Sequence, residues 1–282
     1  MRIDLRHTLR YRYEPAVFIE PIVVRLRPRC DYAHDLLSFA LNIDPAPAGK
    51  AELLDALGNV VTCAWFEGQH ESLLIESRAH VALRLENPFN YLIIDPEALM
   101  LPLSSHAALI PALEPFRRPH QPDPAVRSWA DALREEAGGH TQQFLMTLLR
   151  EIHQNCEFLY RDEGDPWPPG RTLQRRRGAC RDLAVLFTEA CRTQGLASRF
   201  VSGYQLEEQV SGERQLHAWS EVYLPGAGWR GYDPTYGLVV ANQHIALAAG
   251  LAPEEAAPAA GAFRRTGARS SLTFRIEIEE TS

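Results

Sequence analysis

Polar and apolar residues alternate along much of the first 86 positions, which is the pattern of β-strands with one buried face. Gly58-Asn59 separates two apolar runs in "LLDALGNVVTCAWF" and predicts a hairpin, because both residues tolerate the positive φ of a tight turn. No helical period interrupts the region, so we predict a small antiparallel β-sandwich domain over residues 1–95. The other strands are expected in "IDLRHTLRYRY", "IVVRLRP", "LLSFALNID" and "SLLIESRAHVALRLE".

Prolines recur in residues 96–122, which we interpret as a linker. Beyond it, apolar residues recur every three or four positions, which is the spacing of one face of a helix. Asp123 followed by proline predicts the start of a helix, and a second helix opens at Thr141. A third helix follows Cys180. The segment "NQHIALAAGLAPEEAAPAAGAFRRTGARS" is rich in Ala, Gly and Pro and is expected to be mostly loop, whereas "SLTFRIEIEE" alternates as a last strand. Residues 123–282 are therefore predicted to form the second, catalytic domain.

Composition and charge narrow the class of protein. The 282 residues are 45% hydrophobic and 23% charged, with a net charge of −7, which argues against a general nucleic-acid partner. The first twenty residues lack the apolar block of a signal peptide, and no run approaches the roughly 18 apolar residues of a membrane span. We therefore expect a soluble, cytoplasmic protein with no membrane partner, and the sequence leaves its oligomeric state open.

The five cysteines are odd in number, scattered and never in a C-x-x-C pair, which is typical of reduced thiols and not of a disulfide framework or a zinc site. No metal or other cofactor is expected. Cys191 lies on the apolar stripe of the third helix and is interpreted as a core residue. Cys180 stands where a loop becomes that helix, and backbone N–H groups and the helix dipole there favour a thiolate. Four arginines either add positive potential or form a solvated face: Arg175, Arg176, Arg177 and Arg181.

A histidine and an acid suited to this thiolate lie further along the chain. His217 opens the alternating "LHAWSEVYL", and "PGAGW" predicts a turn into a strand that ends at Asp233. Paired as a hairpin, these strands would bring His217 and Asp233 side by side. In a Cys-His-acid triad the histidine exchanges the proton, and the acid fixes its tautomer. None of the other nine histidines has a comparable setting.

These segments also resemble a known family. "RRGACRDLA", "GLASRFVSGY" and "LHAWSEVYLPGAGWRGYDPTYG" are similar to the motifs of the bacterial transglutaminase-like cysteine protease family, whose core is papain-like. The resemblance covers about residues 172–237, and the region around "DALGNVV" resembles the sandwich that precedes this core in many members. It implies an α+β fold, a papain-like transglutaminase core preceded by a small antiparallel β-sandwich domain. By position, Cys180 matches the nucleophile, His217 the histidine and Asp233 the acid.

The resemblance also suggests supporting residues. Trp219 matches the tryptophan of a His-x-Trp pattern and either shields the His-acid pair or is simply a buried core residue. The oxyanion hole would use the backbone N–H of Cys180 and a second donor, for which Gln174 and Trp167 are the candidates. The chain departs from the family where Arg181 replaces a frequent glutamine, and where "LAAGLAPEEAAPAAG" replaces a "GRDY"-like stretch.

The leading hypothesis is a thiol-dependent hydrolase of peptide or isopeptide amides that works through a thioester acyl-enzyme. One alternative is a transglutaminase-type acyl transferase that uses an amine acceptor, and another is a binding protein that keeps the fold without activity. A redox or metal role for Cys180 is disfavoured because no second cysteine or ligand-like spacing accompanies it. Hydrolysis without calcium is expected, because the sequence has no run of spaced acidic residues like a calcium loop.

Overall fold

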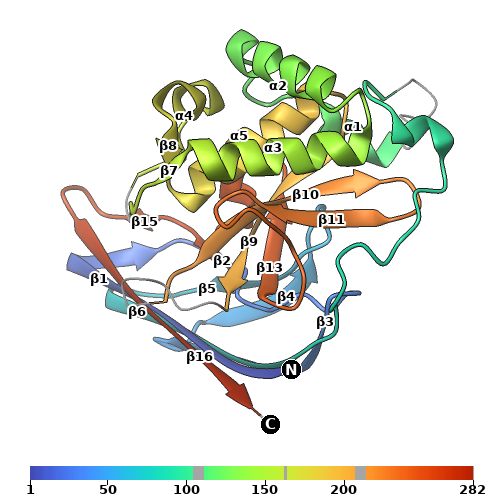
Figure 1. Cartoon of the computed structure of the whole chain (residues 1–282). Coiled ribbons are helices and arrows are strands. Elements are labelled where there is room, and N and C mark those ends of the chain that lie inside the picture. The colour runs from blue at the N-terminus through green and yellow to red at the C-terminus, as the bar shows by residue number, and fades with distance from the viewer. Residues whose placement is uncertain (104–110, 162–163, 207–213, 282) are drawn as a thin grey trace.

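The structure is a computed structural model that describes residues 1–103, 111–161, 164–206 and 214–281. A layer of helices covers one side of a central sheet, and a curved β-region lies against the opposite side (Figure 1). The described residues thus form a β-rich region and a mixed α/β core, as the predicted fold class requires. Residues 104–110 of the predicted linker lie outside the described residues.

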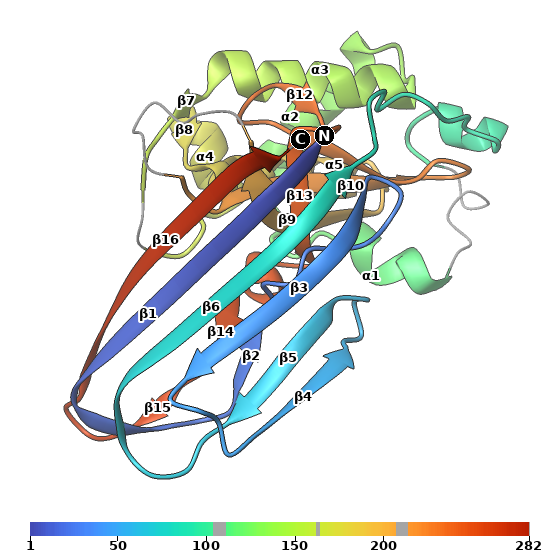
Figure 2. The same ribbon diagram turned by 90° about the horizontal axis from the view of Figure 1, so that it is seen from below.

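The β-region consists of two sheets (Figure 2). In the larger sheet β6 lies between β1 and β3, and β1 also pairs with β15 and β16. Its strands are β1 (Arg2–Ile19), β3 (His34–Asp44), β6 (His70–Leu83), β15 (Phe263–Arg264) and β16 (Arg269–Thr281). The smaller sheet has the order β14-β2-β5-β4, formed by β14 (Ala259–Ala260), β2 (Ile22–Val24), β5 (Val60–Trp65) and β4 (Gly49–Leu54).

The C-terminal strands correct the predicted domain assignment. We placed residues 123–282 in the catalytic domain, but β14, β15 and β16 belong to the sheets of the β-region. β16 runs antiparallel to most of β1, from Arg2 paired with Thr281 to Glu14 paired with Arg269. The alternation of β16 identified a strand whose Ile276 is buried in the β-region core, but alternation alone does not identify the partner strand.

The core contains the helices and a sheet with the order β12-β11-β10-β9-β13. All three predicted helices are present, and Asp123 caps the first by accepting hydrogen bonds from the backbone N–H groups of Ala125 and Val126. The helices are α1 (Glu114–Arg117), α2 (Pro124–Glu136), α3 (Thr141–Asn155), α4 (Pro169–Arg175) and α5 (Cys180–Thr193). The sheet strands are β9 (Ser198–Gln205), β10 (His217–Leu224), β11 (Gly228–Asp233), β12 (Leu238–Val239) and β13 (His244–Gly250). Shorter elements are η1 (Pro96–Leu99), η2 (Pro111–Leu113), η3 (Pro253–Ala256), β7 (Glu157–Phe158) and β8 (Arg177–Gly178).

Strand β13 contradicts the prediction that residues 242–270 are mostly loop. All seven of its residues are buried, and it pairs antiparallel with β9. Alanine is a poor strand former, and three of these residues are alanine, which hid the alternation of "HIALAAG". Because it packs on both faces, the strand accepts these small residues.

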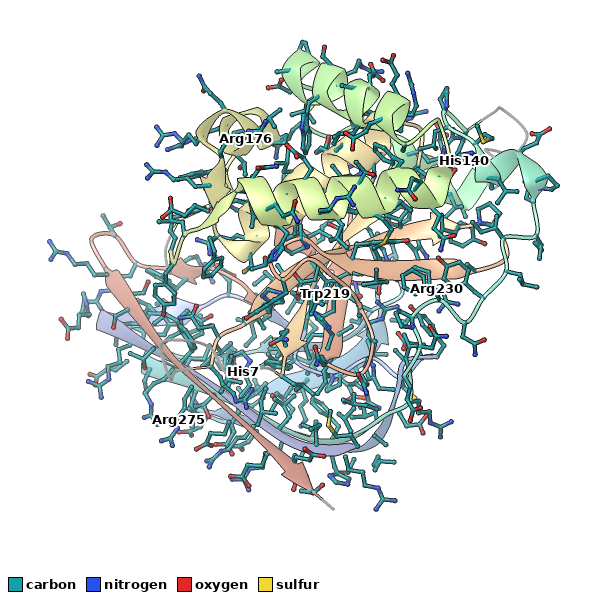
Figure 3. All side chains as sticks on the ribbon, in the orientation of Figure 1. His7, His140, Arg176, Trp219, Arg230 and Arg275 are labelled. Carbon is teal, nitrogen blue, oxygen red and sulfur yellow. The ribbon has the colours of Figure 1, made fainter. Side chains whose placement is uncertain are left out.

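The two faces of the core sheet are buried in different hydrophobic clusters. Residues of α2, α3 and α5 pack with Val222, Leu224 and Tyr232 on one face. On the other face Tyr204, Ile245 and Leu247 join the cluster of the β-region, which lies below Trp219 in Figure 3. The β-region therefore completes the core of the α/β part instead of forming a separate hydrophobic unit.

Buried polar contacts also join the two parts. His7 Nδ1 lies 2.8 Å from the Tyr204 hydroxyl, and burial lowers the pKa of His7 to about 4, so the imidazole is neutral at pH 7. The side-chain amide of Asn59, in the predicted hairpin, donates to the carbonyl of Ala249 and accepts from its N–H, both at 2.9 Å. This pair of bonds fixes β13 to the β-region. Among the described residues, no helix combines the length and apolar character needed to cross a membrane.

Candidate active site

Cys180 is the first residue of α5 and is partly buried. The turn before it is fixed by Asp182, whose carboxylate accepts the backbone N–H of Ala179 at 2.8 Å. Gly178 fits here because a Cβ at this position would lie 2.8 Å from the Asp182 Cβ. The Gly-Ala-Cys sequence thus presents the thiol at the N-terminus of a helix, where the first N–H groups lack intrahelical partners.

Asp182 also anchors the loop that forms one wall beside Cys180. Its fully buried carboxylate accepts hydrogen bonds from the Arg161 guanidinium at 2.7 and 3.0 Å and from the Trp167 backbone N–H at 2.7 Å. Such charge-assisted bonds are short and strong. A carboxylate in the first turn of α5 therefore couples the start of the helix to the neighbouring loop.

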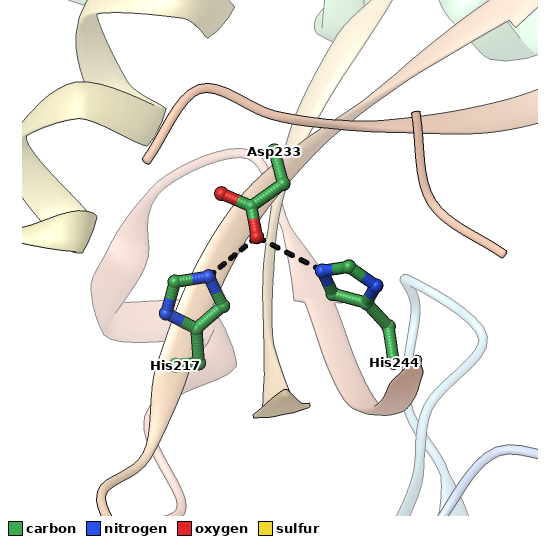
Figure 4. Close-up of side chains that lie close together, drawn as sticks. All are labelled: His217, Asp233 and His244. Atoms are coloured by element: carbon green, nitrogen blue, oxygen red, sulfur yellow. Dashed lines mark hydrogen bonds and ion pairs between the residues drawn. The ribbon is translucent and has the colours of Figure 1, made fainter. Parts of the chain in front are cut away.

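His217 and Asp233 come together as the hairpin prediction requires. The β10–β11 register pairs Ser220 with Tyr232, so Asp233 lies one position further, level with Trp219. His217 is two residues from Trp219 and therefore points to the same face of β10. His217 Nε2 lies 2.6 Å from Asp233 Oδ2, and both side chains are almost completely buried (Figure 4).

The Cys180 thiol interacts with the same imidazole. His217 and Cys180 line the same pocket, and the interaction with Cys180 raises the pKa of His217; because Nε2 is engaged by Asp233, Nδ1 is the atom available to the sulfur. Burial lowers the pKa of His217, but the charge and hydrogen bond of Asp233 and the interaction with Cys180 outweigh burial and raise that pKa to about 10. The imidazole is therefore positively charged at pH 7, as a partner for a thiolate must be.

Asp233 is held as an anion by four hydrogen-bond donors. Its Oδ1 accepts the backbone N–H groups of Thr235 at 2.9 Å and Tyr236 at 3.4 Å. Its Oδ2 accepts His217 and also His244, whose Nε2 lies 2.9 Å away. Burial raises the pKa of Asp233, but the two histidines outweigh it and bring that pKa below its usual range.

His244 is the residue of this site that sequence reasoning missed. We judged that no histidine other than His217 had a suitable setting, because the segment around His244 was interpreted as loop. A usable signal exists in the alternation of "HIALA", which places His244 and Ala246 on one face. Ile245 and Leu247, on the other face, join the β-region cluster.

Trp219 packs directly on both imidazoles and is 1% exposed. Its ring stacks on His217 with centroids 6.2 Å apart and contacts His244 edge-on at 5.1 Å. Gly203 makes room for it, because a Cβ there would lie 2.5 Å from the Trp219 Cη2 atom. The residue thus combines both predicted properties: it is part of the core and it covers the His217 ring.

The structure does not bring the two predicted oxyanion donors to the thiol. Cys180 and His217 line a pocket of about 370 Å³, and neither Gln174 nor Trp167 is among its lining residues. Gln174 is exposed on α4, and the Trp167 ring packs against three guanidinium groups, those of Arg161, Arg171 and Arg175. We chose both by their distance in sequence from Cys180, but α4 and β8 intervene and turn the chain. A side-chain amide that does line the pocket is that of Gln215.

Among the described residues, His217, Asp233 and His244 are the group whose ligand atoms lie close enough to hold a metal ion, all within 4.8 Å of one another. Zinc sits about 2.0–2.2 Å from nitrogen and oxygen ligands, which separates tetrahedral ligand atoms by roughly 3.3 Å. The observed N···O distances of 2.6 and 2.9 Å are shorter and match direct hydrogen bonds. The arrangement therefore fits an acid that orients imidazoles.

Sequence models of two families match the chain. One describes the transglutaminase-like superfamily and matches residues 127–234, and the other describes the bacterial transglutaminase-like N-terminal region and matches residues 3–82. An uncharacterized protein of Mycobacterium tuberculosis is 25% identical over an alignment of 294 positions, gaps included. The alignment covers 98% of the chain and 92% of that protein. A protein-glutamine gamma-glutamyltransferase of Pseudomonas aeruginosa is 30% identical over 134 residues, 42% of the chain and 19% of that enzyme.

A similar fold is found in a solved structure from Cytophaga hutchinsonii, that of a protein assigned provisionally as a cysteine protease. The two structures superpose with a TM-score of 0.73 at 19% identity, over 100% of this chain and 92% of the other. At this level of identity the similarity establishes the fold and not the reaction. The β-region and the core are thus found together in both proteins.

Proposed function

The chain belongs to the transglutaminase-like superfamily, and from this premise we propose that it is a cysteine-dependent hydrolase of peptide or isopeptide amides. The observation that carries the proposal is the buried Asp233–His217 pair, whose imidazole lines the same pocket as Cys180. In this proposal Cys180 is the nucleophile, His217 the proton carrier and Asp233 the acid that orients it.

The proposed reaction has two halves. The Cys180 thiolate attacks the amide carbonyl, a C–S bond forms, and N–H groups at the start of α5 stabilise the oxyanion. His217 then gives its proton to the amine as the C–N bond breaks, which leaves a thioester. In the second half His217 takes a proton from water, the resulting hydroxide attacks the thioester, and the carboxylic acid and the thiolate are released.

Two features support water as the acceptor. Cys180 is partly exposed in an open pocket, and water is present at far higher concentration than any amine. The alternative is transfer of the acyl group to an amine, and the similarity to the Pseudomonas aeruginosa gamma-glutamyltransferase favours it. We also keep the cytoplasm as the proposed compartment, which is consistent with five free cysteines.

The test is mass spectrometry of the products from a library of peptide and isopeptide amides. Each reaction is run with and without a millimolar primary amine, once in chelator and once in calcium. We expect free acids as the main products, equal yields in chelator and calcium, and no product from Cys180→Ala. Cys30→Ala, which removes an exposed thiol elsewhere, is the matched control and should behave like the wild type.

Each other result has a defined meaning. Amine conjugates as the main product would replace hydrolysis by acyl transfer, and activity that appears only with calcium would contradict the proposed lack of a cofactor. Products that persist in Cys180→Ala would show that another group is the nucleophile. No product from any amide would favour a binding protein that has kept the fold.

A further inference from the structure

A second imidazole shares the acid of the proposed triad. His244 Nε2 lies 2.9 Å from Asp233 Oδ2, the same oxygen that His217 Nε2 approaches at 2.6 Å (Figure 4). His244 is 2% exposed and lies at the start of β13. Two histidines from different strands therefore converge on one carboxylate oxygen, although the proposed reaction uses only one of them.

The carboxylate determines which atom of this contact carries the proton. An ionised carboxylate oxygen only accepts hydrogen bonds, so the proton lies on His244 Nε2. The other nitrogen, Nδ1, is buried and has no hydrogen-bond partner among the described residues. In the contact with Asp233, His244 Nε2 is therefore the donor and Oδ2 the acceptor.

The surroundings hold this donor in place. His244 pairs with Gln205 of β9, and its ring meets the edge of Trp219, with the ring centroids 5.1 Å apart. The backbone of the same strand is fixed at Ala249 by the two hydrogen bonds from Asn59. A side chain restrained by its strand, by an aromatic neighbour and by the β-region has little freedom to leave the carboxylate.

We propose that His244 is a positioning residue, whose Nε2–H holds Asp233 Oδ2 in the direction of His217 and so keeps the imidazolium aligned with Cys180. The proposal rests on the proposed function for the roles of the three triad residues. The backbone N–H groups of Thr235 and Tyr236 restrain only Oδ1. Without the His244 donor, the carboxylate can rotate and Oδ2 can leave the plane in which His217 needs it.

The charged groups around the site define what a pH profile would report. Asp233 bonds His217 directly, Cys180 lines the same pocket, and the Tyr236 ring meets the His217 ring edge-on at 5.4 Å. The other charged residues that line the pocket are Arg161, Asp165, Arg181 and Glu254. A variant at His244 leaves all of these groups in place, so a shifted profile can be attributed to the His217–Asp233 pair.

The experiment measures the rate at which iodoacetate alkylates Cys180 as a function of pH. This anionic reagent reacts fastest with a thiolate beside an imidazolium. The fall of the rate at high pH, the alkaline limb of the profile, therefore reports loss of the proton from His217. No substrate has to be known. We compare the wild type with His244→Asn and His244→Leu, which lack a donor at the Nε2 position, and with His244→Gln, whose amide nitrogen can reach it.

We expect the alkaline limb of both donorless variants to move about one pH unit lower, in line with loss of one hydrogen bond to a charged group, because a misaligned Asp233 stabilises the imidazolium less. At the midpoint of the wild-type limb they should therefore react about fivefold more slowly. His244→Gln should restore most of the rate and the position of the limb. His80→Asn is the matched control, because His80 bonds Asp4 at 2.6 Å on the surface of the β-region and its loss should not alter the profile.

Three results would overturn the proposal. Donorless variants with the wild-type profile would show that Asp233 is already held without His244. An alkaline limb that moves to higher pH would show that His244 competes for the carboxylate instead of positioning it. Equal damage in His244→Gln and His244→Asn would assign the effect to imidazole packing. A shifted profile in enzyme that hydrolyses no amide would contradict the proposed function alone, because alkylation does not require turnover.

Discussion

Replacing Glu221 with glutamine should uncouple the β-region from the core in a pH-dependent way. Glu221 lies on β10 and is 5% exposed. It accepts hydrogen bonds from Arg199 Nε at 2.7 Å and from Arg29 Nη1 at 3.1 Å. Arg199 belongs to the neighbouring strand of the core, whereas Arg29 comes from the chain of the β-region. One buried carboxylate therefore neutralises two guanidinium groups across the boundary.

The size of the effect follows from the shift in the pKa of Glu221. Burial raises this pKa, but Arg199 and then Arg29 outweigh burial and lower it from 4.5 to about 2. A difference of roughly 2.5 units corresponds to about 3 kcal/mol of unfolding free energy. Because the folded-state pKa is depressed, this stabilisation is fully present above about pH 4.5 and is lost as the pH falls through about 2.

The assay is denaturant unfolding of the wild type and Glu221→Gln at pH 7 and at pH 2.5. At pH 7 the variant should be less stable by about 3–5 kcal/mol, the usual cost of removing one partner from a buried ion pair. At pH 2.5 most of that difference should vanish, because the wild-type carboxylate is then close to protonation. Glu52→Gln is the control, since Glu52 lies 3.9 Å from Arg27 in an exposed pair, and its stability should not change at either pH. An equal difference at both pH values would refute the electrostatic explanation.

Three other predictions concern the site and the interface. Asp233→Asn should lower kcat by about two to four orders of magnitude with little change in KM, as measured by steady-state kinetics. A raised KM with unchanged kcat would instead make Asp233 a substrate-binding residue. Brief iodoacetamide treatment at mildly acidic pH should label Cys180 and not Cys191, because burial holds the pKa of the Cys191 thiol well above its usual value, and equal labelling in peptide maps would contradict this. Tyr204→Phe removes the hydroxyl beside His7 and should cost about 1–3 kcal/mol in urea unfolding, so unchanged stability would show that the buried bond contributes nothing.

The sequence predicted those parts of the molecule whose signals are local. Asp123 followed by proline marks a helix start wherever that helix packs, and the position of Cys180 after Gly-Ala follows from the adjacent residues. The hairpin with His217 and Asp233 was equally accessible, because a short turn joins its two strands. The structure brings Cys180, His217, Asp233 and Trp219 together, and the catalytic roles of the first three remain predictions.

Features that depend on partners distant in sequence were not accessible in the same way. The role of β13 follows from its position between β9 and Asn59, and its alanines gave no strand signal on their own. His244 was missed for that reason. Gln174 and Trp167 failed as oxyanion candidates because separation along the chain does not reveal the direction in which α4 turns them.

The pairing of the last strand with the first determines the order in which this chain can fold during synthesis. β1 leaves the ribosome well before β16, the strand that covers one of its edges. The α/β core is made in between, and its helices need only local contacts. Until β16 emerges, the nascent chain therefore carries a long strand with an unpaired edge, open to pairing with other chains. A ribosome stalled shortly before residue 269 would hold the helices of the core beside an incomplete β-region, so pairing of β1 with other chains is possible until β16 has been made.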